Sequence, residues 1–271
     1  MPSTLLTAVL RMRGLWLLAA LLSPGVMLSQ TDYYNLDGGR PLRVEDALVI
    51  EHRALELQLA PLRFTGGGRG THVAIAVEPE MSWGVLPRTQ LEVGVPLARA
   101  GTANRAVGAA GVHVSVLHAL NTETLGWPGL AVRAAVVLPA GALGPTRPLL
   151  TLGALATRTL PKARVHVNAS VTPGRAGGRV GDDAARWRVG LAADRTLVMH
   201  SMLVGAELVA EEPLGGAAVV WSAGVGTRYQ VGPRTAFDAG VGRRVTGNGE
   251  WFVTLGSAIS LGIPHRRGGA Q

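Results

Sequence analysis

Large apolar residues alternate with small or polar ones along many short segments of this chain. In residues 71–83, Val73, Ile75 and Val77 occupy every second position, with small or polar residues between them. A side-chain period of two belongs to a β-strand with one apolar face. The same alternation predicts twelve strands, covering roughly residues 52–62, 71–83, 89–97, 107–118, 129–138, 148–158, 163–171, 185–192, 196–209, 216–229, 235–243 and 250–262. The chain is therefore expected to be all-β.

Short turns and longer loops alternate between these strands. The stretch VLPRTQLEVGVP from Val85 returns as VGPRTAFDAGVG from Val231, and each places a short Pro-Arg turn before an alternating strand. Further short connections are expected at 121–124, 161–162 and 194–195, and the connections between them are longer and rich in Gly, Arg or Asp. This plan is typical of bacterial outer-membrane barrels, in which tilted strands of about 9–11 residues span the bilayer. A closed barrel also leaves no backbone group unpaired in lipid.

The sequence thus predicts a transmembrane antiparallel up-and-down β-barrel of about 12 strands in the outer membrane. Charged residues make up only 16% of the chain, against about 25% in ordinary soluble domains. The predicted division is a signal peptide at 1–29, a segment at 30–51 that stays periplasmic or enters the barrel, the barrel at 52–263, and a polar tail at 264–271. Arg11 and Arg13 before a short apolar run indicate the signal peptide, with a retained anchor as the alternative.

If the apolar faces meet lipid, the charged residues between them point into the lumen. The predicted acidic wall consists of Glu56, Glu78, Glu80 and Glu92. The predicted basic wall consists of Arg133, Arg164, Arg186, Arg188 and Arg228. Facing each other, the two walls would set up a transverse field that discriminates solutes by charge. Alternatively, these residues pair across the interior and leave no pore.

Catalytic, cofactor and metal motifs are absent from the sequence. It contains no HExxH, GxSxG or phosphate-loop pattern, and no histidine shares a short strand face with a carboxylate. With no cysteine, disulfides, thiolate metal ligands and a cysteine nucleophile are excluded. The net charge is +8, but the arginines are scattered rather than clustered on one face, which argues against nucleic acid. No enzymatic activity is predicted, and no cofactor.

Three other classes of protein stay open at this point. A soluble exported β-protein would show the same alternation with its apolar faces turned inward. A barrel without an open pore would serve a structural or adhesive role. A barrel hydrolase would need a Ser, His and acid cluster in the lumen. The preferred function is a passive channel or transporter for small solutes. Its expected partners are outer-membrane lipid, small-molecule solutes and the barrel insertion machinery, and the oligomeric state is left open.

Several segments also resemble a known family. They are RPLRVEDA at 40–47, LELQLAPL at 55–62, EPEMSWGVLPRTQLEVGVPL at 78–97, and the later hairpins. On these residues the chain resembles the bacterial outer-membrane β-barrel family of transporters assigned to the meta pathway of phenol degradation. The resemblance implies passage of small solutes, aromatic or hydrophobic compounds among them, and brings no catalytic residues. One departure is the C-terminus, which continues past Ile263 as PHRRGGAQ instead of ending in an aromatic residue.

Overall fold

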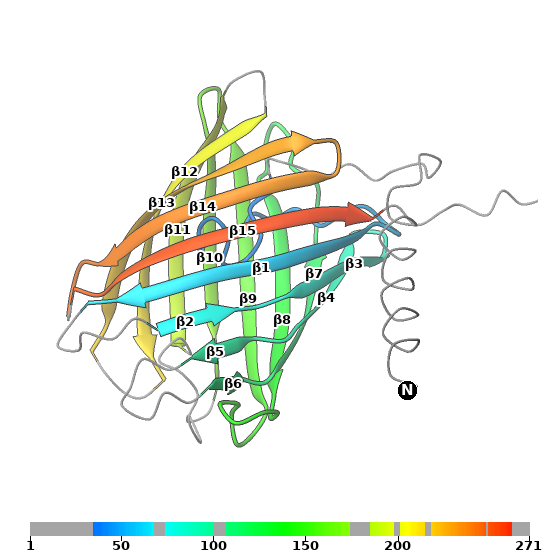
Figure 1. The fold of residues 1–271 in the computed structure, drawn as a ribbon. Coiled ribbons are helices and arrows are strands. Elements are labelled where there is room, and N and C mark those ends of the chain that lie inside the picture. The colour runs from blue at the N-terminus through cyan, green and yellow to red at the C-terminus, as the bar shows by residue number, and fades with distance from the viewer. Residues whose placement is uncertain are drawn as a thin grey trace, which may run out of the picture.

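The protein is a closed antiparallel β-barrel (Figure 1). The computed structural model describes residues 35–67, 74–99, 107–173, 185–197, 201–214, 218–247 and 249–261. Its strands are β1 (Leu55–Gly66), β2 (Ala74–Val77), β3 (Glu80–Leu86), β4 (Thr89–Gly94), β5 (Leu97–Arg99), β6 (Val107–Ala109), β7 (Val112–Ala119), β8 (Gly129–Leu138), β9 (Leu149–Thr159), β10 (Arg164–Val171), β11 (Ala185–Leu197), β12 (Met202–Pro213), β13 (Val220–Gly232), β14 (Thr235–Arg244) and β15 (Trp251–Leu261). From β7 to β15 each strand pairs with the next, β1 pairs with both β2 and β3, β2 pairs with β5, β3 with β4, β4 with β7 and β5 with β6, and β15 pairs with β1 to close the sheet. Across the described ranges, no helix is long and apolar enough to cross a membrane.

The fifteen strands make twelve passes of the wall, because three passes are interrupted. The breaks fall between β2 and β3 at Pro79, between β4 and β5 at Pro96, and between β6 and β7 at Gly111. Proline cannot donate to a ladder, and Gly111 has a φ of +117°, which favours glycine. The breaks lie side by side, because Val95 N–H donates to Pro79 O at 3.1 Å and Ala110 N–H donates to Pro96 O at 2.7 Å. The wall therefore bends along one line.

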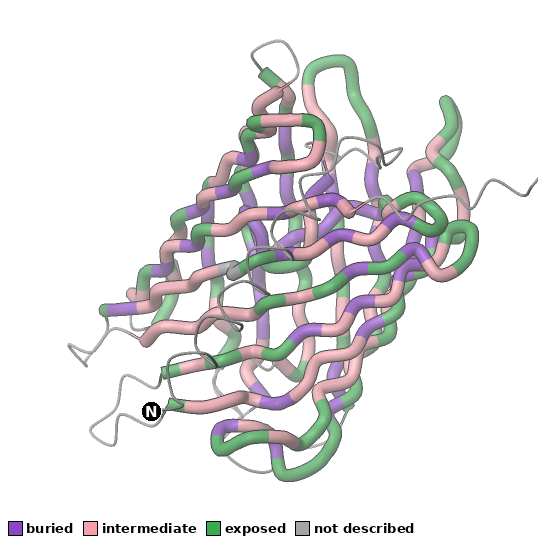
Figure 2. The backbone as a smooth tube through the Cα atoms, turned by 45° about the vertical axis from the view of Figure 1, so that its right-hand side comes forward, coloured by how far each residue is buried: buried purple, intermediate pink, exposed green. Residues whose placement is uncertain are grey.

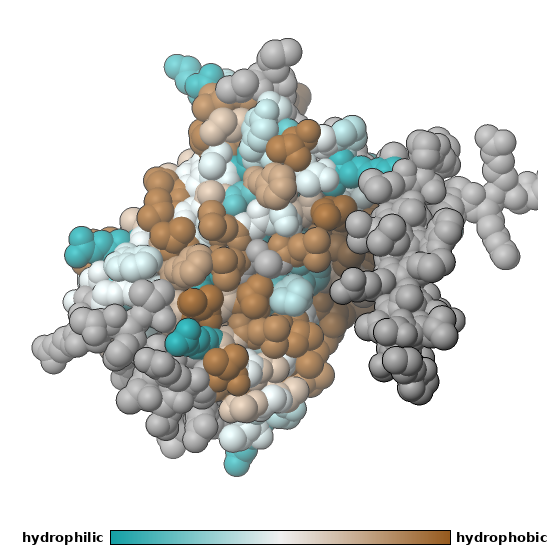
Figure 3. All heavy atoms as spheres, in the orientation of Figure 1, coloured by the Kyte–Doolittle hydropathy of each residue, from teal (hydrophilic) through white to brown (hydrophobic). Residues whose placement is uncertain are grey.

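The wall is apolar outside and polar inside. Exposed side chains on its outer face include Leu59, Val167 and Val225, whereas Ser82 and His166 on the inner face are buried. Buried and exposed residues alternate along the strands (Figure 2). Apolar side chains gather over the middle of the wall, and most hydrophilic ones lie near its ends (Figure 3). A soluble β-protein would reverse this arrangement, so the wall is that of an outer-membrane barrel.

The predicted turns hold with one exception. The hairpins at Pro87–Arg88 and Pro233–Arg234 are turns, as expected. The turn predicted at Asp194–Arg195 is wrong, because both residues lie inside β11, which continues to Leu197 and pairs there with Met202 of β12. Asp194 faces the lumen, where Arg164 and His166 hold its carboxylate. The predicted signal peptide and polar tail lie outside the described residues.

A cation placed in the middle of the outer face should destabilise the barrel. Leu191 lies mid-strand in β11, between the exposed Val167 and Leu208 of the neighbouring strands. We expect Leu191→Arg to lower the free energy of unfolding by about 2–4 kcal/mol, since a guanidinium there meets hydrocarbon. Val231→Arg is the control, because Val231 is exposed close to the end of β13 and should cost only about 0–1 kcal/mol. Urea titrations in lipid vesicles measure both; equal losses would place Leu191 away from the bilayer centre.

Candidate functional site

The chain before the first strand lies inside the barrel. We call residues 35–54 the luminal segment; its described part is drawn in blue within the wall in Figure 1. Its backbone amides bond to wall side chains that are far apart around the barrel. Val44 N–H donates to Glu207 Oε2 at 2.9 Å, and Ala47 N–H donates to Thr157 Oγ1 at 2.8 Å. Inward polar side chains therefore satisfy backbone groups that form no sheet of their own.

Glycines on the inner face make room for this segment. A Cβ added at Gly226 would lie 2.7 Å from the Cβ of Pro41, and one at Gly190 would lie 2.5 Å from a methyl of Val44. At both glycines the nearest atoms belong to the luminal segment. Side chains at these positions would collide with the segment, so the glycines form its seat.

Buried ion pairs anchor the beginning of the segment to the last strands. Arg40 contacts Asp238 of β14 at 3.1 Å and Asp37 at 3.0 Å. Arg228 of β13 contacts the same Asp37 at 2.6 Å and the carboxylate of Glu56 at 3.9 Å. Both arginine side chains are 1% exposed, so these pairs are out of reach of bulk water. A buried charge needs such partners, and here the segment and the wall supply them to each other.

A second group of ion pairs holds Glu45 and Asp46 of the segment to β8 and β10 of the wall. Arg133 of β8 pairs with Glu45 of the segment and with Glu92 of β4. Arg164 of β10 pairs with Asp194 at 2.8 Å and lies 3.6 Å from Asp46. Together with the first group, these contacts fix the luminal segment across the width of the barrel.

The residues of the two predicted walls lie on two separate groups of strands. Glu56, Glu78, Glu80 and Glu92 lie on or beside β1–β4, and the five arginines lie on β8–β13. The arginines do not form a bare basic surface: Arg188 pairs with Glu211 at 2.8 Å, and Arg186 pairs with Glu212 at 3.2 Å. Each of the five has a carboxylate partner. The interior is therefore a set of ion pairs, some within the wall and some through the luminal segment.

The sequence did not indicate several residues that form these ion pairs. On the wall these are Asp194, Glu207, Glu211, Glu212 and Asp238, and in the segment they are Asp37, Arg40, Arg43, Glu45 and Asp46. One signal was available: the run from Arg40 to Asp46 is densely charged in a chain where charge is scarce. Its partners on the wall are more than 80 residues away in the chain, so no local pattern indicates them.

One hydroxyl, imidazole and carboxylate chain does occur in the lumen. His166 Nε2 lies 2.8 Å from Asp194 Oδ2, and its Nδ1 lies 3.0 Å from Thr157 Oγ1. The imidazole is fully buried, and the Thr157 hydroxyl already accepts the Ala47 N–H. A hydrolase needs a nucleophile that substrate can reach. This chain of groups instead fixes the luminal segment to β9.

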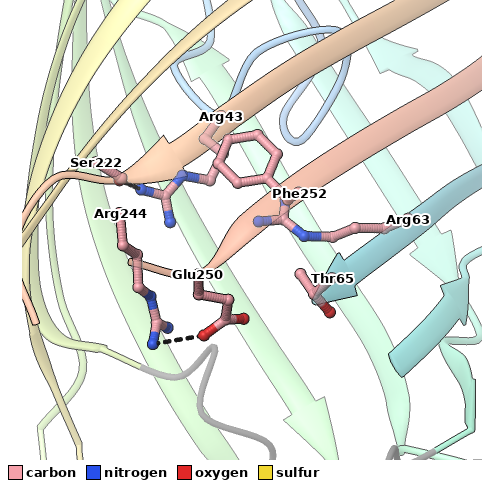
Figure 4. Close-up of a pocket in the computed structure, with 7 residues that line it drawn as sticks. All are labelled: Arg43, Arg63, Thr65, Ser222, Arg244, Glu250 and Phe252. Atoms are coloured by element: carbon pink, nitrogen blue, oxygen red, sulfur yellow. Dashed lines mark hydrogen bonds and ion pairs between the residues drawn. The ribbon is translucent and has the colours of Figure 1, made fainter. Parts of the chain in front are cut away.

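A pocket lies beside Arg43, near the end of the barrel that carries the longer loops (Figure 4). Outer-membrane barrels carry long loops on the extracellular side. The pocket is a small, open depression lined by Arg43, Arg63, Thr65, Ser222, Arg244, Glu250 and Phe252. The guanidinium of Arg63 lies 4.4 Å from the centre of the Phe252 ring, and that of Arg43 lies 5.9 Å from it.

The pocket combines positive charge with one aromatic face. Of its four charged side chains three are arginines, and its one acid, Glu250, pairs with Arg244 at 2.9 Å. Arg43 also contacts Glu211 at 3.2 Å, so this carboxylate balances part of the positive charge of Arg43. Guanidinium groups bind carboxylates and stack on flat rings. Such a lining can attract a carboxylate or another small anion to the mouth of the pocket.

An apolar outer wall, a charged interior and a sheet closed on itself define a β-barrel of the bacterial outer membrane. No protein-family model matches the sequence, and no curated protein sequence matches it significantly. Among solved structures, an outer membrane channel from Pseudomonas putida F1 is similar with a TM-score of 0.59 and 12% identity, covering 80% of this chain and 98% of that one.

Two porins share the same fold. The KdgM porin, solved in complex with disordered oligogalacturonate, matches with a TM-score of 0.53 and 10% identity over 77% of this chain and 99% of its own. The NanC porin matches with a TM-score of 0.52 and 9% identity over 77% of this chain and 100% of its own. At these identities the likeness establishes the fold, and the function is argued from the interior.

Proposed function

We propose that this protein is a passive channel for small solutes, in which the luminal segment sets the width of the path. The observation that carries the proposal is how the lumen is filled. An eight-stranded barrel is narrow enough for side chains to fill, and barrels of 16 or more strands leave a water channel. Here a separate chain segment occupies the lumen, and glycines form its seat. A segment that belongs to no strand of the wall can move aside, whereas side chains of the wall strands cannot.

The pocket at the loop end supports small anions as the solutes, aromatic acids in particular. A carboxylate would meet Arg63 and Arg244, and a flat ring would stack on a guanidinium plane. The family resemblance implies aromatic or hydrophobic compounds, and an aromatic acid satisfies both indications. The oligogalacturonate bound to KdgM is likewise a carboxylate, although it is a sugar polymer.

A barrel without conduction is the second candidate. It is favoured by the buried ion pairs of the luminal segment, because Arg40 and Arg228 hold Asp37 from two sides. In that case the segment would be a permanent part of the core, with a structural role for the barrel. Conductance of the purified mature protein in a planar bilayer separates the two candidates.

Reversing the pocket charge should change ion selectivity. In a KCl gradient the mature protein should prefer chloride, and Arg63→Glu with Arg244→Glu should move the reversal potential towards potassium, since the two substitutions replace cations by anions on the path. Arg158→Glu is the matched control, because Arg158 is exposed and bonds to carbonyls of the loop at 124–127, at the other end of the barrel. A reversal potential unchanged by the double substitution would remove the pocket from the path.

A further inference from the structure

Two carboxylates and an imidazole meet on the inner face beside the bend in the wall. One ligand atom from each of Glu78, Glu80 and His113 lies within 4.8 Å of the other two. His113 Nδ1 is 3.2 Å from Glu78 Oε1, and the Ser82 hydroxyl lies 3.4 Å from Glu80 Oε1. None of these three side chains has a hydrogen bond or ion pair to the described luminal segment, and none lines the arginine pocket.

Strand register brings the three residues together. Glu80 of β3 pairs with Gly94 of β4, and Gly94 pairs with His113 of β7. Because Gly94 carries no side chain, the residues on either side of it can meet above its backbone. A Cβ at Gly94 would lie 3.0 Å from Glu78 Oε1 and 3.5 Å from Glu80 Oε2. Gly94 therefore leaves open the space that the two carboxylates occupy.

The two carboxylates have no arginine or lysine partner among the residues that the structure describes. Nearby inward carboxylates differ: Glu92 pairs with Arg133, and Glu56 lies 3.9 Å from Arg228. Two carboxylates side by side in a wall that spans the membrane repel each other unless one is protonated or a cation lies between them, and one imidazole supplies at most a single positive charge.

We propose that Glu78, Glu80 and His113 bind a divalent transition-metal ion of the Zn²⁺ type. An imidazole nitrogen with two carboxylate oxygens is a donor set for zinc and its neighbours, whereas calcium and magnesium take oxygen ligands alone. Three protein ligands leave positions for water or for a carboxylate of a passing solute. The site joins β3 to β7 across the bend, and it does not depend on whether the barrel conducts.

Calorimetry with Zn²⁺ tests the site in the untagged, folded mature protein after treatment with a chelator. The expected result is saturable binding with one ion per barrel. His113→Ala and Glu80→Gln should each weaken it by more than the about 10–100-fold that is lost when only an outer partner of a metal site is removed. His118→Ala is the control, because His118 is exposed and bonds to Thr89 at 2.9 Å, away from the cluster.

A gel-mobility shift on heating shows that each variant is folded. If His113→Ala does not fold, Glu80→Gln carries the test, since it keeps the size of the side chain. The site is disproved if the wild-type protein takes up no Zn²⁺, or if His113→Ala and Glu80→Gln bind it as the wild type does. Loss of binding in these two variants, but not in His118→Ala, supports it.

Discussion

Deleting residues 35–50 should raise the single-channel conductance severalfold. The deletion removes the chain that crosses the lumen, and the wall keeps ion pairs of its own, such as Arg133 with Glu92 and Arg188 with Glu211. Wall residues that lose a partner in the segment, such as Asp238, would then face a water-filled lumen instead of a buried one, so the barrel should stay folded while its path widens. Planar-bilayer recordings of the full mature chain and the shortened one measure the change.

Two point variants accompany the deletion. Gly226→Val should raise conductance to a smaller extent, because the three atoms nearest to its Cβ belong to Pro41 and Leu42 of the luminal segment. Gly153→Ala is the control, since a Cβ there meets only ordinary contacts of 3.5 Å or more. If the deletion leaves conductance unchanged, the segment does not limit the path.

Replacing Arg228 by leucine should be among the most destabilising single changes in the barrel. The substitution would leave Glu56 without its arginine, and Asp37 would keep Arg40 alone. Removing one partner of a buried ion pair costs about 3–5 kcal/mol, because the remaining charge stays buried. The backbone carbonyl of Asn35 would also lose its 2.8 Å hydrogen bond from the guanidinium. Urea unfolding in vesicles, followed by tryptophan fluorescence, gives the difference.

Arg186→Leu is the matched control for this measurement. Arg186 also pairs with a carboxylate, Glu212, at 3.2 Å, but its side chain is 46% exposed. Exposed pairs contribute about 0–1 kcal/mol, so this variant should unfold close to the wild type. Similar losses in both variants would contradict the buried network at Asp37.

The strands were predictable because a bilayer requires an apolar outer face on each of them. Along β13, the outward Val225 and Tyr229 alternate with the inward Gly224 and Arg228, and this period of two is written in the sequence. Asp194 shows where such reasoning fails. An Asp-Arg pair is common in turns, yet here the Asp is a luminal ion-pair partner, and only the three-dimensional neighbours reveal this.

For the interior, the sequence predicts only which charged residues face the lumen and the sign of their charge. Strand parity places Glu92 and Arg133 in the lumen, but their mutual contact and the insertion of Glu45 between distant strands depend on barrel closure. The cluster at His113 has the same origin, since its ligands come from two segments, residues 78–80 and β7, that lie on either side of Gly94 in the sheet. Neither arrangement has a local sequence signature.

The most direct test of the account is a disulfide between the luminal segment and the wall. A Cβ at Gly190 would lie 3.8 Å from the Cβ of Val44, which is the usual separation across a disulfide. The chain has no cysteine, so Val44→Cys with Gly190→Cys allows one intramolecular bond only. Mass spectrometry of the protein from outer membranes should find these two residues cross-linked. Two free, reactive thiols would show that the segment does not lie in the lumen.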